Sequence, residues 1–203
     1  MLPHMLKNAA RRYLLGAVAL PLTVGILGLV AVLGPWTPLA LDRANARYTA
    51  GDVAGAEEAY AALAEGWTTP ATRAEAATRA GLLALARGDA GEAAERLRRA
   101  VDLHPDADRR ADVRIQLAGV YRDQLSDPAR AAEEYERAVL DADAAATLVA
   151  AATCWERAGQ IDRAVDAWMR AVNAPGDDAA REQAEAGLLR AERSMVAVVD
   201  AEP

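Results

Sequence analysis

The strongest constraint on the fold is a pattern of residues that returns four times after residue 40. Each copy has a turn, an alanine four residues after it, and a large residue four positions further on. The turns are Gly51-Asp52, Gly88-Asp89, Ser126-Asp127 and Gly159-Gln160, the alanines are Ala56, Ala93, Ala131 and Ala164, and the large residues are Tyr60, Leu97, Tyr135 and Trp168. The alanines stand 37, 38 and 33 residues apart. Repeats of this length are typical of solenoids.

The chemistry of each copy predicts a pair of antiparallel helices. A glycine just past a helix can take the left-handed conformation that satisfies the last carbonyl groups, and an aspartate after it can cap the next helix. The alanine is small enough for two helices to cross, and the large residue lies on the same helix face. About a quarter of the chain is alanine and only 4% is aromatic, which favours helices over a sandwich or barrel. The predicted fold class is all-α.

This pattern resembles the tetratricopeptide repeat (TPR) family, whose unit is a helical hairpin of about 34 residues. The family's motifs are clearest in Leu117-Ala118-x-x-Tyr121 and in Ala131-x-x-x-Tyr135-x-x-Ala138. The resemblance implies an α-solenoid of about four TPR-like repeats over residues 40–175. An amphipathic helix at 177–194 would cap its open end, and a frayed tail is expected at 195–203.

The resemblance also implies a protein-binding groove, because the first helix of each pair lines the concave face of such solenoids. The groove positions transferred from the family are Asn45, Tyr48, Thr49, Thr78, Leu82, Leu85, Ile115, Arg122, Asp123, Val149, Thr153, Glu156 and Arg157. Such a groove could accept an extended segment or a helix of a partner. Equally, these positions could be exposed sites with tolerated residues. No lysine follows Lys7, which argues against a groove that clamps chaperone tails.

Residues 14–33 form a run of twenty residues without a charge, long enough to cross the roughly 30 Å core of a bilayer. Tyr13 and Trp36 flank the run, where aromatic rings favour the membrane interfaces. We therefore expect a transmembrane helix at 13–34 and a short, proline-stiffened linker at 35–39 that keeps the solenoid beside the membrane. A buried core helix and a cleaved signal peptide are the alternatives.

The charges around this run predict its orientation. Lys7, Arg11 and Arg12 precede it, and no acidic residue occurs before Asp42. The positive-inside rule then places residues 1–12 in the cytoplasm and the repeats outside, in the periplasm of a bacterium if the membrane is the inner one. The exported part holds 20 basic and 30 acidic residues, and a domain so acidic is a poor binder of nucleic acid.

Few residues offer chemistry, and the sequence predicts neither an enzyme nor a cofactor or metal site. One cysteine, Cys154, and two histidines, His4 and His104, cannot form a closed zinc site or an internal disulfide. We expect His104 to be solvated at a turn and Cys154 to be buried and inert. A hydrolase or redox enzyme that uses one of these two residues is the alternative.

The expected function is that of a membrane-anchored adaptor or assembly factor, with protein partners in or outside the same membrane. The layout is similar to that of bacterial proteins with one anchor and periplasmic repeats. A permanent accessory subunit of a larger membrane complex is the alternative.

Overall fold

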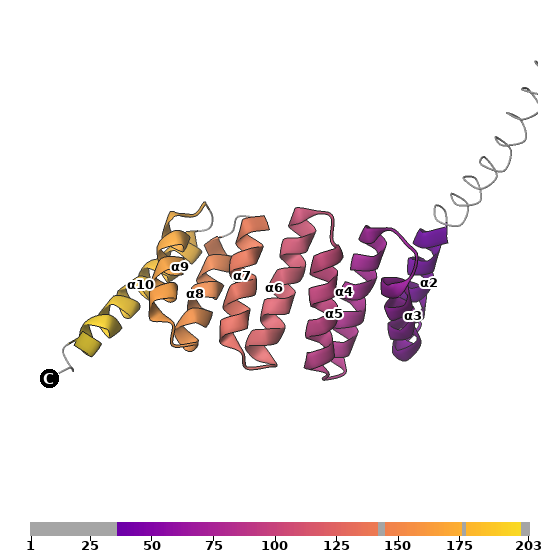
Figure 1. Cartoon of the computed structure of the whole chain (residues 1–203), viewed down its shortest axis with the longest axis horizontal. Helices are drawn as coiled ribbons and strands as arrows, with labels where there is room; N and C mark the ends of the chain where they lie inside the picture. Colours follow the sequence, from indigo (N-terminus) through magenta and orange to yellow (C-terminus); the bar gives the residue numbers. More distant parts are fainter. Residues whose placement is uncertain (1–35, 142–144, 176–177, 200–203) are drawn as a thin grey trace, which may run out of the picture.

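The computed structural model describes residues 36–141, 145–175 and 178–199, and within them the chain forms a row of nine helices (Figure 1). The helices are α2 (Trp36–Thr49), α3 (Val53–Glu65), α4 (Pro70–Ala86), α5 (Ala90–Leu103), α6 (Ala107–Asp123), α7 (Pro128–Asp141), α8 (Ala145–Arg157), α9 (Ile161–Asn173) and α10 (Asp178–Val199). None of these helices is both long and apolar enough to cross a membrane. The transmembrane helix predicted at 13–34 and the stub at 1–12 lie outside the described residues.

The helices α2 to α9 form four antiparallel hairpins, one for each predicted repeat, and α10 follows them. Each helix packs against the next along the chain. The hairpins follow one another along the row in chain order (Figure 1). The predicted α-solenoid is confirmed.

The turns between the two helices of each hairpin have the predicted left-handed backbone. The φ angles are 85° at Gly51, 90° at Gly88, 72° at Gly159 and 52° at Ser126. The aspartates after the first three turns cap the next helix: Asp52 accepts from the Gly55 N–H, Asp89 from the Glu92 N–H and Asp127 from the Arg130 N–H, each at 3.0 Å. Gln160, in the fourth copy, makes no side-chain cap. Local turn chemistry therefore sets where the hairpins begin and end.

The repeated alanines and large residues form the interior of the solenoid. The four alanines are fully buried, and the large residues four positions later are almost completely buried, as the repeat predicted. Trp155 and Trp168 are the bulkiest of the fully enclosed side chains. This arrangement explains why the chain is rich in alanine and poor in aromatic residues, because small residues at the crossings leave room for only a few large ones.

Two boundaries differ from those expected from the sequence. A linker was expected at 35–39, but α2 already begins at Trp36. Pro38 lies in its first turn, where the missing N–H is not needed for the helix. The predicted frayed tail at 195–203 is helical up to Val199, and no glycine or proline occurs between residue 194 and that end to stop α10 earlier. Residues 200–203 lie outside the described part.

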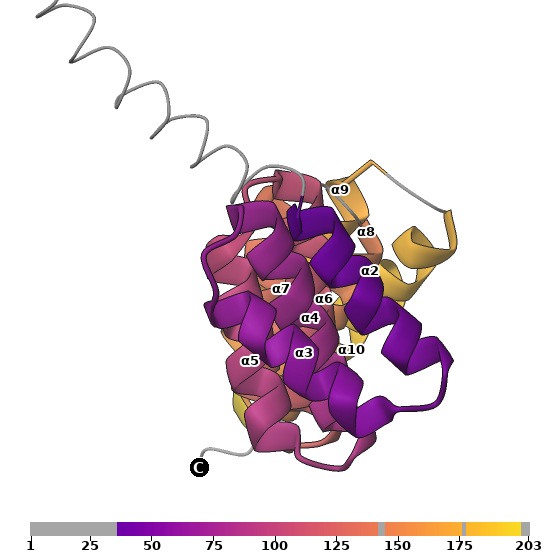
Figure 2. The same cartoon turned by 90° about the vertical axis from the view of Figure 1, so that its right-hand side faces the viewer.

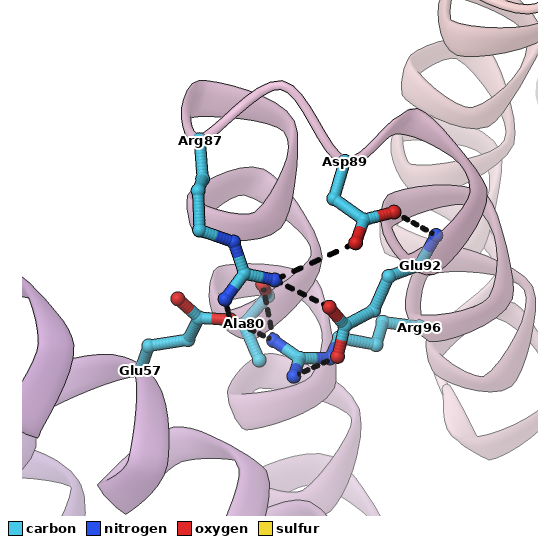
Figure 3. Close-up of polar contacts among 6 residues, drawn as sticks. All are labelled: Glu57, Ala80, Arg87, Asp89, Glu92 and Arg96. Atoms are coloured by element: carbon cyan, nitrogen blue, oxygen red, sulfur yellow. Dashed lines mark hydrogen bonds and ion pairs between the residues drawn. The ribbon is translucent and has the colours of Figure 1, made fainter.

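Ion pairs join neighbouring second helices (Figure 3). Glu57 on α3 accepts from Arg96 on α5 at 2.8 Å, and the same guanidinium nitrogen donates to the carbonyl oxygen of Ala80 on α4 at 3.0 Å. Glu92 pairs with both Arg96 and Arg87. The Glu57–Arg96 contact therefore connects the first repeat to the second.

Candidate functional site

We call the exposed side of the four first helices the first-helix face, and all thirteen predicted groove residues belong to these helices. Two hollows interrupt this face. The amino-terminal hollow encloses about 390 Å³ and is lined by residues of α2, α3, α4 and α6 together with His104 at the end of α5. The carboxy-terminal hollow encloses about 340 Å³ between α6 and α8. The first hollow is lined by the predicted residues Tyr48, Thr78 and Leu82, and the second by Arg122, Asp123, Thr153 and Arg157.

Exposed apolar side chains border the amino-terminal hollow. Tyr48 on α2 is 51% exposed and Leu82 on α4 is 39% exposed. Buried Tyr60, Leu83 and Val113 form its apolar background. Since the two exposed residues come from neighbouring repeats, the stacking of α2 beside α4 is what brings them to the same hollow.

A hydrogen-bonded set of polar residues fixes the wall between α2 and α4. The Oδ1 atom of Asn45 accepts from the Tyr60 hydroxyl at 2.6 Å and from Arg79 Nη1 at 2.7 Å. The Arg79 Nε donates to Glu75 at 2.7 Å. Burial opposes the charge of Arg79, but the hydrogen bonds to Glu75 and Tyr60 prevail and raise its pKa. Asn45 was predicted as a groove contact, and its amide oxygen is used to hold the two repeats together.

His104 lines the same hollow, contrary to the expectation that its imidazole is solvated. The residue is only 8% exposed, and its Nδ1 atom is buried without a hydrogen-bond partner within the described part of the chain. It caps the end of α5, and α6 is bound to that end by Arg110, whose Nη1 donates to the His104 carbonyl at 3.0 Å. Burial lowers the pKa of His104, which favours the neutral imidazole.

The carboxy-terminal hollow is lined by the predicted residues Arg122, Asp123, Thr153 and Arg157, together with Cys154. The guanidinium of Arg122 binds Asp123 through two hydrogen bonds of 2.7 Å. These bonds raise the pKa of Arg122 and lower that of Asp123. The charges of this hollow are therefore largely satisfied by one another.

Arg122 has a third contact, since its Nη1 donates to the Tyr135 hydroxyl at 3.0 Å. Thr153 donates to the carbonyl of Val149 at 2.8 Å and so adds little free polarity. A ligand at this hollow would have to compete with existing contacts, except at the exposed Arg157.

The remaining predicted positions are only partly available. Val149 is buried in the core and so offers a partner little surface. Thr78 is also buried, and its hydroxyl donates to the Ala74 carbonyl at 2.9 Å, although it still lines the amino-terminal hollow. Glu156 lies 3.7 Å from Arg190 of α10.

Three other predicted residues lie outside the linings of both hollows. Leu85 is half-buried and packs against the core, whereas Ile115 is exposed on α6. Thr49 is exposed, and its hydroxyl donates to the Ala46 carbonyl at 3.0 Å. Only Ile115 adds exposed apolar surface.

Several lining residues of the amino-terminal hollow were missed from the sequence, although a signal for them existed. The missed residues are Glu75, Arg79, His104, Arg109, Asp112 and Gln116. Glu75, Thr78, Arg79 and Leu82 follow the spacing 0, 3, 4, 7, and so do Arg109, Asp112, Val113 and Gln116. That spacing places each set on one helix face. Extending the face around Thr78 and Leu82 would have found Glu75 and Arg79.

The residues considered for catalysis are not brought together. His104 lines the amino-terminal hollow and Cys154 the carboxy-terminal one. Cys154 is fully buried, as expected, and burial raises the pKa of its thiol. In the described ranges, no three histidine, cysteine, aspartate or glutamate side chains group as metal ligands.

No family model and no curated protein matches the sequence. Solved structures do match the fold. A putative kinesin light chain of Podosopora anserina with nearly identical TPR-like repeats is 19% identical, covers 81% of this chain and 89% of its own, and superposes with a TM-score of 0.52. The MamA protein is 18% identical, covers 84% of this chain and 98% of its own, and also gives 0.52. The chain therefore has a TPR-like repeat fold.

Proposed function

We propose that this chain is a membrane-anchored adaptor or assembly factor that binds a protein partner on its first-helix face. The observation that carries the proposal is the amino-terminal hollow, where exposed Tyr48 and Leu82 adjoin the polar residues Arg109, Asp112 and Gln116. Exposed apolar side chains beside polar ones are typical of surfaces that bind peptide segments of other proteins. The proposed role is binding and not catalysis, and it requires no cofactor.

The proposed location is the inner membrane of a bacterium, with the amino terminus in the cytoplasm and the solenoid in the periplasm. The uncharged run at 14–33 and the basic residues before it support this topology. Because α2 begins at Trp36, only two residues separate it from the end of that run. Partners embedded in, or emerging from, the same membrane are then within reach of the hollow. A reporter active only outside the cytoplasm, fused after Pro203, should be active.

Photo-crosslinking in cells tests the binding surface. A photoreactive amino acid at Tyr48 or Leu82 should give a defined crosslinked protein, because both side chains border the hollow. The matched control is Glu58, which is exposed on the second helix of the first repeat. Equal crosslinks from all three positions, or crosslinks from Glu58 alone, would refute the proposed surface.

A second variant tests whether the contact matters for binding. Leu82→Arg places a charge at an exposed site, so the fold should survive while capture of the crosslinked partner falls at least about tenfold. Native purification then separates two forms of the same role. One stoichiometric partner set would indicate the alternative, a permanent subunit of a complex, whereas a changing set of clients would indicate an adaptor.

A further inference from the structure

The connection between α3 and α4 displays an unusually exposed tryptophan. Trp67 is 93% exposed, far more than the other large hydrophobic residues of the described chain. No charged residue occurs from Gly66 to Thr72, between Glu65 and Arg73. A fully hydrated indole beside an uncharged segment points to a contact outside the solenoid itself.

The backbone that carries Trp67 is held in place on both sides. The Gly66 N–H donates to the Leu63 carbonyl at 3.2 Å, and the Thr68 N–H donates to the Gly66 carbonyl at 3.0 Å. Thr69 caps α4 by accepting from the Thr72 N–H at 3.2 Å. The indole is therefore presented by a connection with defined hydrogen bonds.

This connection lies at the end of the solenoid where α2 begins. Successive helices run in opposite directions, so the end of α3 and the start of α4 return to the level at which α2 starts (Figures 1 and 2). Helix α2 packs against both α3 and α4. The Gly-Asp turns, such as Gly51-Asp52, lie at the opposite end.

We propose that Trp67 and the uncharged connection around it rest in the lipid interface of the membrane that holds residues 14–33. This inference rests on the anchor in the proposed function. Tryptophan favours the boundary between lipid chains and head groups, because its ring is apolar and its N–H can still bind water or a head group. The uncharged run ends only three positions before Trp36, so the end of the solenoid at which α2 begins is held close to that boundary.

The connection between α5 and α6 lies at the same end of the solenoid, and its composition differs from that of the segment around Trp67. The residues between α5 and α6, His104-Pro105-Asp106, lead into Asp108 and include no tryptophan. The connection nearest to α2 is therefore the one suited to lipid. Because the exported part has ten more acidic than basic residues, the expected partner is the zwitterionic interface and not an anionic lipid.

This contact would orient the solenoid. The α3–α4 connection would face the membrane and the Gly-Asp turns would face away from it. The first-helix face would then stand to the side, open to a partner that rises from the same membrane.

Fluorescence quenching in vesicles tests the contact with the full chain. The chain has four tryptophans, of which Trp155 and Trp168 are buried. In a Trp36→Phe background, phosphatidylcholine brominated near the head group should therefore quench mainly Trp67. The quenched part of the emission should fall at least about twofold when Trp67→Phe is added.

The outcomes are distinguishable. If the full chain fails to float with the vesicles, the anchor and this inference are both wrong. If it floats, but the two variants are quenched equally, the inference is wrong and the anchor stands. If Trp67 is shielded from both brominated lipid and aqueous acrylamide, a protein surface covers it, and the lipid contact is refuted.

Discussion

Replacing Gly187 by alanine should detach α10 from the end of the solenoid. A Cβ atom at Gly187 would lie 2.5 Å from Cε2 of Trp168 and 2.6 Å from Cδ2 and Cζ2. The indole cannot yield easily, because Trp168 is almost completely buried. Helix α10 must therefore move away from α9. Overpacking of this kind typically costs about 1–3 kcal/mol.

Helix propensity alone predicts that Gly187→Ala stabilises α10, and a matched control separates this effect from the overpacking. Alanine is more favourable than glycine in a helix interior by about 0.8–1.0 kcal/mol. At Gly119 in α6, an added Cβ would meet nothing within 4 Å, so Gly119→Ala should stabilise the protein by about that amount. Because the propensity gain applies at both sites, the two variants should differ by the overpacking cost of about 1–3 kcal/mol, which is about 5-fold or more in an opening equilibrium.

Hydrogen exchange followed by mass spectrometry measures this difference locally. Repeats of a solenoid contact mainly their neighbours, so the loss should be confined to the carboxy-terminal end. In Gly187→Ala, amides of α10 should exchange faster while those of α5 and α6 keep their protection. Unchanged or slower exchange in α10 would show that the helix does not pack on Trp168 as described.

Three further results are expected. Asn45→Ala removes the acceptor shared by Tyr60 and Arg79 and should lower the free energy of unfolding by about 1–3 kcal/mol in urea titrations. Burial lowers the pKa of His104 in the folded state, so the unfolded state binds more protons. The stability that the neutral His104 contributes should therefore be full above the ordinary pKa of 6.5 and decline as the pH falls below it. His104→Gln should flatten that decline in thermal melts between pH 7 and 5. Since the Cys154 thiol is buried and its pKa is raised, maleimide labelling of the folded protein should be roughly 100-fold slower than labelling in denaturant.

The features that were predictable from the sequence are those set by near neighbours in the chain. The left-handed turn at Gly88, the cap at Asp89 and the buried crossing at Ala93 depend on spacings of one to four residues. Four repetitions of the same short pattern then determine the order of the hairpins. The all-helical solenoid follows from these local rules.

The features that the local sequence could not show depend on contacts between distant segments. Asn45 bonds to Arg79 across 34 positions, and nothing in either local sequence identifies the partner. His104 is buried at the end of α5, in a hollow that residues of α2, α3, α4 and α6 also line, and its place at a turn before a proline did not indicate this burial. Val149 belongs to the core of the fourth repeat, and its position in the TPR motif alone did not indicate this burial.

The two hollows of the first-helix face should contribute unequally to the binding proposed above. In the carboxy-terminal hollow, Arg122 is already bound to Asp123 and Tyr135, so a partner gains only the difference between new and existing contacts. In the amino-terminal hollow, Tyr48 and Leu82 are exposed to water, and covering them gains the free energy of apolar burial. Binding energy should therefore be concentrated in the first two repeats. These are also the repeats nearest to the proposed anchor, so a partner that emerges from the membrane would meet the stronger site first.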